Sequence, residues 1–364
     1  MKVSTLSTLV LAGLASGTLA SIEVKKGVEL PVKGTTVNFS ELCSGPNART
    51  EPPKGAIVVD ASGTHSGSFR TVAEGVENLP NSTAGQTLFV FPGVYEEQVS
   101  VPKLAGPLVL QGYTCDTTSY SANQVTITQA KAQKDIPPEI ENNRNYLTST
   151  LGLKSKQVKV YNLNVANTAG KIEENGQAVA IYADGSDYGF YACNFTGYQD
   201  TVCANKGREL YARSYINGAV DFIFGQRAMA WFESCDIESI AEGWISANGN
   251  ENETITSEYV FNKARVFGTS GKNSTYLGRP WRPFARVVWQ NSELSDVVSP
   301  EGWAAWDDAT STADVYFKEF NNSGPGGNTD KRVEFSGQLD APVAITDILG
   351  KGYEDEWWVD KNFL

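Results

Sequence analysis

The chain has 364 residues, 41% of them hydrophobic and 20% charged, which is typical of a globular protein and excludes a largely disordered one. Its formal net charge of −12 argues against nucleic-acid binding, because that function needs a basic surface to neutralise phosphates. The 34 glycines and the 11% of aromatic residues favour many short strands over long helices.

The N-terminus has the pattern of a secretory signal peptide. Lys2 supplies the positive charge, residues 6–14 form a mostly apolar stretch, and residues 18–20 form a small-residue cleavage site. The apolar stretch is too short to cross a bilayer, and an ordinary N-terminal helix is the alternative. We therefore expect residues 1–20 to be removed and a secreted, extracellular protein without a membrane partner to begin near Ser21.

The glycosylation sequons and the cysteines are consistent with secretion. Six Asn-x-Ser/Thr sequons predict a glycoprotein, at Asn38, Asn81, Asn194, Asn252, Asn273 and Asn321. The cysteines show no zinc-binding spacing, and their odd number leaves at least one thiol over: Cys43, Cys115, Cys193, Cys203 and Cys235. One or two disulfides are expected, and the sequence does not fix their pairing.

No linker, charge block or change of composition interrupts the chain after about residue 56, so we expect residues 21–364 to form a single domain. Residues 60–80 predict a loop followed by a short amphipathic helix. Strand-like runs rich in Val, Ile, Tyr and Phe then follow, separated by turns: Thr87–Phe91, Leu108–Leu110, Val125–Thr128, Val158–Val165, Val179–Tyr182, Gly189–Phe195, Glu209–Tyr215, Val220–Phe224, Ala228–Phe232 and Ala264–Gly268.

Polar residues recur at equal spacing along these runs. Gln177 and Gln199 are 22 residues apart, as are Gln199 and Asp221. A period near twenty is typical of one coil of a parallel β-solenoid, in which residues one period apart stack at about 4.8 Å. Such a coil would bring these residues and Asp200 to one face. A doubly wound α/β sheet fits less well, because regular helices between the strands are missing.

The sequence argues against a catalytic site that depends on histidine. His65 is the single histidine, so any Ser-His-Asp or Cys-His site would have to use this loop residue. No Gly-x-Ser-x-Gly elbow and no EF-hand loop occurs. We expect no cofactor and no metal, although a calcium site built from oxygen ligands stays open.

The remaining candidates for chemistry are carboxylates, amides and an arginine in three segments. These are GYQDT at 197–201, DFIFG at 221–225 and LGRPW at 277–281. Taken singly, the segments also fit a turn, a strand edge and a packed aromatic residue.

Together, the three segments resemble the pectin methylesterase (pectinesterase) family. GVYEE at 93–97 and QAVAIY at 177–182 complete five motifs in the family's order, and the resemblance extends to about Trp306. The acidic composition and short N-terminal region resemble the fungal branch. Cys193 and Cys235 fall where related sequences carry cysteine, but Cys235 has no convincing later partner.

The resemblance implies an all-β fold, a right-handed parallel β-helix, and hydrolysis of the methyl esters of polygalacturonate (pectin) to pectate and methanol. It implies that Asp221 is the nucleophile and that Asp200 is first the acid and then the base. It also implies that Gln177 and Gln199 donate hydrogen bonds to the oxyanion. Arg279 would favour the ionised form of the nucleophile, because an adjacent positive charge stabilises a carboxylate.

The same resemblance implies a substrate-binding set. Gln177, Arg279 and Trp281 would contact methyl-esterified homogalacturonan. Tyr198 and Phe222 offer further apolar faces for a sugar ring, and packing into the solenoid wall is the alternative for both. A monomer is expected by analogy.

Three other functions stay open. A polysaccharide hydrolase or lyase also uses paired carboxylates, but it produces new chain ends instead of methanol. A non-catalytic carbohydrate-binding solenoid would release nothing. The same fold acting on another ester, such as a thioester, is the third. The net charge of −12 further suggests that the protein leaves de-esterified, negatively charged stretches readily.

Overall fold

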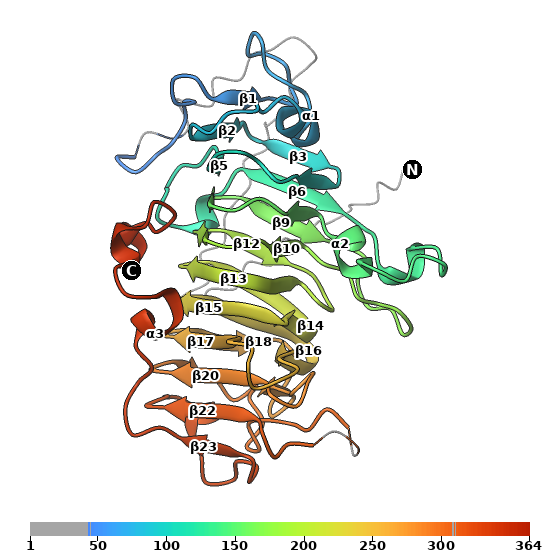
Figure 1. The fold of residues 1–364 in the computed structure, drawn as a ribbon, viewed down its shortest axis with the longest axis vertical. Helices are drawn as coiled ribbons and strands as arrows, with labels where there is room; N and C mark the ends of the chain where they lie inside the picture. Colours follow the sequence, from blue (N-terminus) through green and yellow to red (C-terminus); the bar gives the residue numbers. More distant parts are fainter. Residues whose placement is uncertain (1–42, 44, 308, 310) are drawn as a thin grey trace, which may run out of the picture. The chain divides into compact units, whose positions relative to one another are not determined.

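The computed structural model describes residues 43, 45–307, 309 and 311–364. The expected signal peptide lies outside these residues. Strands dominate, and every pairing between them is parallel. Successive strands stack coil upon coil (Figure 1), so the predicted all-β parallel β-helix is confirmed.

The strands are β1 Ile57–Val59, β2 Gln86–Val90, β3 Gly93–Glu96, β4 Val99–Val101, β5 Leu108–Gly112, β6 Val125–Gln129, β7 Leu151–Leu153, β8 Val158–Tyr161, β9 Asn164–Asn167, β10 Ile181–Asp184, β11 Tyr188–Tyr191, β12 Asn194–Thr196, β13 Val202–Ala212, β14 Tyr215–Gly225, β15 Arg227–Glu233, β16 Asp236–Asn248, β17 Glu258–Asn262, β18 Arg265–Gly268, β19 Thr275–Gly278, β20 Arg286–Gln290, β21 Glu293–Leu294, β22 Tyr316–Phe320 and β23 Ser336–Gln338. The helices are α1 Val72–Glu77, α2 Arg144–Thr148 and α3 Ile345–Leu349, with 3-10 turns η2 Tyr120–Ala122, η3 Gln133–Asp135, η4 Pro325–Gly327, η5 Tyr353–Asp355 and η6 Lys361–Phe363.

Three ladders of parallel strands form the walls of the solenoid. The first wall contains β1, β2, β5, β8, β11, the end of β13, β15, β17, β20, β22 and β23. The second contains β3, β6, β9, β12 and the starts of β14 and β16, then β18 and β21. The third contains β4, β7, β10, the start of β13, the ends of β14 and β16, and β19. The third wall carries the candidate site.

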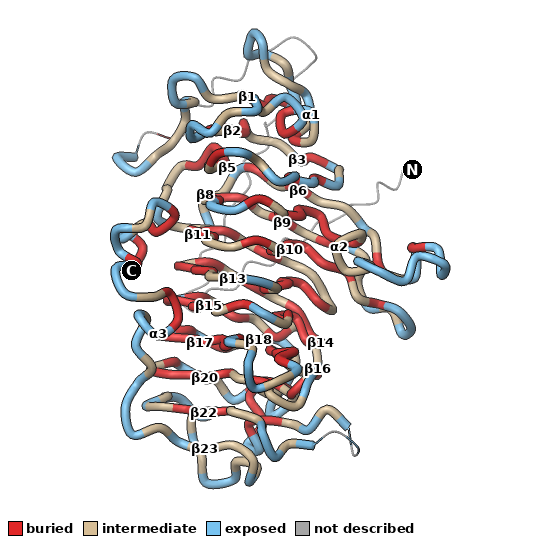
Figure 2. Tube along the Cα trace, in the orientation of Figure 1, coloured by how far each residue is buried: buried red, intermediate tan, exposed pale blue. Residues whose placement is uncertain are grey.

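Aromatic rings stack along the interior from coil to coil. Neighbouring ring centroids lie 4.5 Å apart for Phe190–Tyr211, 4.6 Å for Tyr211–Phe232, 4.4 Å for Phe232–Phe261 and 3.9 Å for Phe261–Trp289. Each pair is in register on adjacent strands, which are about 4.8 Å apart in any sheet. The distance between the rings therefore follows from the distance between the strands. All five rings of this stacked column are buried, on strands that Figure 2 shows as largely buried.

Corners divide three predicted strands in two. The corner residues Asn162, Ala192 and Arg213 have φ of 51°, 47° and 48°. The runs concerned are Val158–Val165, Gly189–Phe195 and Glu209–Tyr215. Alanine and arginine rarely adopt this left-handed conformation, so local sequence does not predict these corners and the stacking of coils imposes them.

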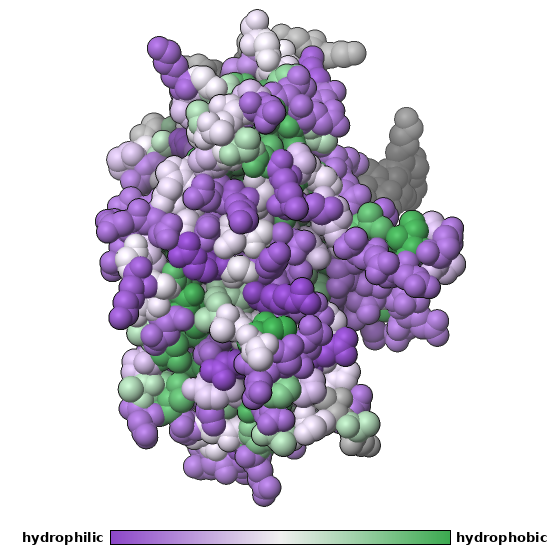
Figure 3. All heavy atoms as spheres, in the orientation of Figure 1, coloured by the Kyte–Doolittle hydropathy of each residue, from purple (hydrophilic) through white to green (hydrophobic). Residues whose placement is uncertain are grey.

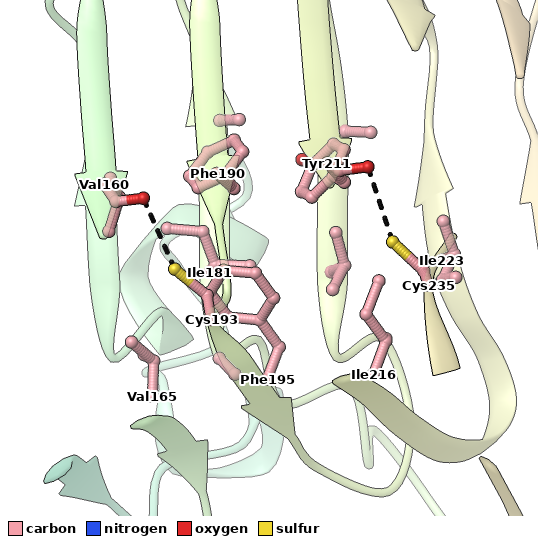
Figure 4. Close-up of a cluster of buried hydrophobic side chains, with 14 of the residues drawn as sticks. Val160, Val165, Ile181, Phe190, Cys193, Phe195, Tyr211, Ile216, Ile223 and Cys235 are labelled. Atoms are coloured by element: carbon pink, nitrogen blue, oxygen red, sulfur yellow. Dashed lines mark hydrogen bonds between the residues drawn. The ribbon is translucent and has the colours of Figure 1, made fainter. Parts of the chain in front are cut away.

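The cysteines are divided between one disulfide and three thiols. Cys43 and Cys115 form the disulfide, whereas Cys193, Cys203 and Cys235 are buried free thiols. The thiols of Cys193 and Cys235 donate weak hydrogen bonds of 3.5 and 3.4 Å to backbone carbonyls on neighbouring coils (Figure 4). Cys193 and Cys235, which fall where related sequences carry cysteine, are therefore not joined by a disulfide.

The predicted helix within residues 60–80 is confirmed as α1. Thr71 caps it and forms a capping box with Glu74, which satisfies two of the helix's first free N–H groups. Its apolar side, Val72 and Val76, is buried in the main core.

The C-terminal segment covers the outer face of the first wall, where Figure 1 shows it in red. Ile348, Leu349 and Trp358 pack with Leu210 and Trp231 of the wall. Hydrophilic residues cover most of the face drawn in Figure 3. Within the described residues, no helix is long and apolar enough to span a membrane.

Candidate active site

Two aspartates lie side by side on the third wall. Val202 pairs with Ile223, so Asp200 and Asp221, each two residues earlier, occupy equivalent positions on adjacent coils about 4.8 Å apart. Both have a positive φ, 65° for Asp200 and 49° for Asp221. The backbone N–H of Asp200 donates to the carbonyl of Val220 at 3.1 Å. The predicted convergence of the two aspartates is therefore seen in the structure.

The spacing that led to them is one residue too long. The strand register is 21 residues at this coil, and Gln199 is bridged to Val220, the neighbour of Asp221. Gln177 and Gln199 nevertheless line the same pocket as the aspartates. A shift of one residue still leaves both glutamines beside the aspartates, because they lie next to the positions that stack in register.

Arg279 distinguishes the two aspartates. Its Nε donates to Oδ1 of Asp221 at 2.8 Å and its Nη2 donates to Oδ2 at 2.6 Å. The guanidinium lies between two indole rings, 3.6 Å from the ring centroid of Trp244 and 4.2 Å from that of Trp306. This packing fixes the plane of the guanidinium, so both hydrogen bonds go to Asp221 and none goes to Asp200.

The pKa values of both carboxyls are raised, to different degrees. Burial raises the pKa of Asp221, and the hydrogen bonds and charge of Arg279 partly offset this. The pKa of Asp200 is raised well above its ordinary value by burial and by the negative charge of Asp221. Two carboxyls this close titrate as a coupled pair, and the contacts of Arg279 with Asp221 favour ionisation of Asp221 over that of Asp200.

Amide groups face the aspartates across a pocket of about 220 Å³. Neither Gln177 nor Gln199 donates a side-chain hydrogen bond to another described residue, so both amides are free to donate to a ligand. Gln133 and Asn145 line the same pocket and are joined by a hydrogen bond from Gln133 Nε2 to Asn145 Oδ1. The pocket thus offers neutral amide donors beside two carboxyl groups.

Aromatic residues form the apolar side of the pocket. Trp281 lies edge-on to Phe224 with ring centroids 6.1 Å apart, and both line it. Tyr198 lies instead in an adjoining pocket that shares Gln199. Phe222 is 0% exposed and belongs to the interior core, so its predicted role in binding substrate is wrong. Side chains alternate along a strand, and Phe222 points inward because its neighbour Asp221 points outward.

Five residues that line the pocket were absent from the predicted site: Gln133, Asn145, Phe224, Ala247 and Trp306. Trp244, which stacks on Arg279 but does not line this pocket, was also missed. Phe224, Ala247 and Trp244 could have been found from the register, because they lie on the paired strands β14 and β16. Gln133, Asn145 and Trp306 come from segments between strands, whose lengths follow no period. No sequence pattern relates them to the aspartates.

His65 is engaged elsewhere. Its Nδ1 lies 2.8 Å from Oδ2 of Asp60, and its ring stacks on Phe91 with centroids 3.6 Å apart. Both contacts are in the first coils, away from the aspartate pair. Among the described residues, no group of three or more His, Cys, Asp or Glu is placed to hold a metal ion.

Known proteins share this architecture. A family model described as pectinesterase matches residues 56–344. A pectinesterase from Aspergillus aculeatus is 43% identical over 326 residues, covering 87% of this chain and 95% of the relative. The crystal structure of the pectin methylesterase from Aspergillus niger in deglycosylated form matches with a TM-score of 0.77 and 37% identity, covering 87% of this chain and 100% of that one. Pectin methylesterase from carrot matches with a TM-score of 0.71 and 28% identity, covering 80% of this chain and 91% of that one. The chain therefore belongs to the pectinesterase family of carboxylic ester hydrolases.

Proposed function

We propose that this pectinesterase hydrolyses the methyl esters of polygalacturonate, with Asp221 as the nucleophile and Asp200 as the acid and then the base. The asymmetry of the aspartate pair carries the proposal. Arg279 contacts both oxygens of Asp221, and no hydrogen bond from Arg279 reaches Asp200. One carboxyl is thereby held ionised for attack while its neighbour keeps a proton.

In the first half of the reaction, a carboxylate oxygen of Asp221 attacks the ester carbonyl carbon. The carbonyl π electrons move to its oxygen, and the amides of Gln177 and Gln199 stabilise this oxyanion by hydrogen bonds. When the tetrahedral intermediate collapses, the bond to the methoxy oxygen breaks. Asp200 donates its proton to that oxygen, so methanol leaves and an acyl-enzyme anhydride remains on Asp221.

In the second half, Asp200 is a carboxylate and accepts a proton from water. The hydroxide so formed attacks the acyl carbon, and the bond to the Asp221 oxygen breaks. The product leaves as galacturonic acid, which loses its proton to the solvent, while Asp221 is again ionised and Asp200 again carries a proton. The free enzyme is restored, and one water molecule is consumed for each methanol released.

The apolar side of the pocket fits the substrate. Trp281 offers an indole face for a sugar ring or an ester methyl group, and Trp306 closes the same side. Arg279, already paired with Asp221, lies close enough to contact a bound galacturonate as well. We therefore assign methyl-esterified homogalacturonan to this pocket.

The experiment measures methanol and reducing ends released from highly methylated pectin. The wild type should release methanol without new chain ends, Asp221→Ala should release none, and Asp200→Ala should be slowed greatly. Asp236→Ala is the matched control, because Arg265 binds that carboxylate in the same two-bond geometry on the second wall, at 2.9 and 2.8 Å. New chain ends would assign the pocket to a hydrolase or lyase, and full activity of Asp221→Ala would remove Asp221 from its role.

We also propose that the enzyme is secreted and glycosylated and acts as an extracellular monomer. The pattern of residues 1–20 supports secretion, and five of the six sequons support glycosylation, whereas Asn194 lies in β12 with its side-chain oxygen buried. N-terminal sequencing of the mature protein should begin near Ser21, and light scattering should give the mass of one chain.

A further inference from the structure

A basic groove runs beside the third wall, at the end of its strands opposite the aspartates. It has a volume of about 1010 Å³. We define it by the five cationic side chains that line it: Lys103, Lys154, Lys156, Lys206 and Arg227. A concentration of cations is unexpected on a chain with a net charge of −12.

The cations follow the stacking of the coils. Lys103 follows the end of β4, and Lys154 and Lys156 follow the end of β7, which pairs with β4. Two coils further on, Lys206 pairs with Arg227. The cations therefore come from four of five successive coils, which span roughly 19 Å at about 4.8 Å per coil. The coil of β10 between them contributes Asp184 and Asp187 instead. Charges distributed over this length fit a linear partner better than a single small anion.

Most of these charges have no counter-ion among the residues that the structure describes. No carboxylate of the described residues forms an ion pair with any of the four lysines. Arg227 is the exception, because it lies 3.3 Å from Glu251.

Two carboxylates also line the groove, and each has another partner. Asp187 is paired with Arg208 at 2.7 Å, and Asp184 accepts a hydrogen bond from Asn205 Nδ2 at 3.0 Å. Four lysines therefore remain against the single unneutralised charge of Asp184, and the groove is positive although the chain is negative.

The groove adjoins the catalytic pocket through two aromatic rings. The ammonium of Lys154 lies 3.6 Å from the ring centroid of Tyr146, and this ring is edge-on to Tyr182 at 5.4 Å. Tyr182 and Tyr146 pack in the same cluster as Trp281. Lys206 lies in β13, six residues after Asp200, which precedes that strand; this is a separation of roughly 20 Å at about 3.3 Å per residue. A polymer at the pocket is thus within reach of the groove.

We propose that the basic groove binds a de-esterified, negatively charged stretch of homogalacturonan, separately from the catalytic pocket. The inference rests on the proposed function, because that function makes free galacturonate carboxylates next to the groove. A linear polyanion matches a linear row of unpaired lysines, whose flexible ammonium groups bind carboxylates without strict geometry. A nucleic acid fits less well, because no described residue lining the groove is aromatic and could stack on a base.

The groove reverses the expectation from net charge. A −12 chain would repel the product if its charge were evenly distributed. Here a local positive row lies beside the pocket, and fields from nearby charges dominate over distant ones in salt solution. The enzyme should therefore hold the acidic stretches that it produces, and highly methylated pectin should acquire blocks of free acid.

The test measures binding of a fluorescent, fully de-esterified oligogalacturonate of about ten units by anisotropy, at low and at about 200 mM salt. This probe contains no ester, so binding is separated from turnover. The groove variant carries Lys103→Gln, Lys154→Gln, Lys156→Gln and Lys206→Gln. The matched control removes the same charge from exposed lysines elsewhere, through Lys54→Gln, Lys272→Gln, Lys331→Gln and Lys351→Gln. Thermal unfolding of both variants establishes that they are folded.

At low salt the groove variant should bind the probe about tenfold more weakly than the wild type, and the control less than about twofold more weakly. Both variants should release methanol from highly methylated pectin within about twofold of the wild-type rate, but the groove variant should leave shorter blocks of free acid. Equal binding by all three proteins, equal weakening in both variants, or equally tight binding of an oligonucleotide of the same charge would overturn the inference. Absence of methanol from the wild type would instead refute the proposed function.

Discussion

Arg279→Lys tests the central contact of the site, because it keeps the positive charge but removes the two-pronged hydrogen bond to Asp221. A lysine ammonium is a point charge that cannot satisfy both carboxylate oxygens along parallel bonds. The site is poorly screened by solvent, since the side chains of Arg279 and Asp221 are 15% and 7% exposed. The ionised form of Asp221 therefore loses a hydrogen bond that solvent water does not replace at this buried position.

The size of the effect follows from the lost bond. A hydrogen bond to a charged group contributes about 1.5–3 kcal/mol, and about 1.36 kcal/mol corresponds to one pH unit of titration. The acid limb of the profile of kcat/KM against pH, which reports ionisation of the free aspartate pair, should move upward by about one to two pH units. At a pH between the acid and alkaline limbs the loss in rate should be smaller than at acidic pH.

The assay is methanol release from highly methylated pectin between pH 4 and 8. Arg286→Lys is the control, because Arg286 forms a similar pair with Glu258, with Nε 2.8 Å from Oε2, and stacks 4.1 Å from the ring centroid of Tyr316. That variant should leave the profile in place. A uniform loss of activity in Arg279→Lys with an unmoved acid limb would refute the idea that Arg279 keeps Asp221 ionised.

Three further predictions concern the amides and the buried carboxyls. Gln177→Ala and Gln199→Ala should each lower kcat about 10²–10³-fold with little change in KM, and an unchanged kcat would remove that amide from the oxyanion site. Asp200→Asn should abolish turnover yet gain stability relative to the wild type as pH rises. The reason is that the folded-state pKa of Asp200 is raised, so its stabilising contribution is complete below the unfolded value of about 3.9 and is lost as pH rises through the folded value. Melting temperatures from pH 4 to 8 that fall in parallel for both proteins would contradict this. Glu209→Gln should likewise gain stability relative to the wild type as pH rises, without loss of activity. The reason is that Glu209 is 0% exposed and burial raises its pKa well above the ordinary value. A steeper loss of stability with pH in that variant would show that the wild-type carboxylate is ionised in the fold.

The interior of the solenoid could be predicted because it follows local pattern. Short runs of β-branched and aromatic residues mark the strands, and their apolar positions become the buried column of rings. The corners could not be predicted, since Ala192 and Arg213 adopt a left-handed conformation that neither residue prefers. The register of the neighbouring coils imposes that conformation, and register is a property of the assembled wall.

The site divides in the same way. The catalytic candidates could be identified from sequence, because Asp200, Asp221 and Arg279 stand in specific motifs and a spacing near twenty placed the two aspartates on one face. That Arg279 binds Asp221 alone follows from the packing of distant coils. The tertiary structure also turned Phe222 inward and brought Trp306 to the pocket from a segment between strands. The basic groove also depends on tertiary structure, because its cationic side chains come from different coils and lie close together only when the coils stack. A motif fixes which residues are present, whereas the direction of a side chain and its distant neighbours depend on register and packing, which no local segment contains.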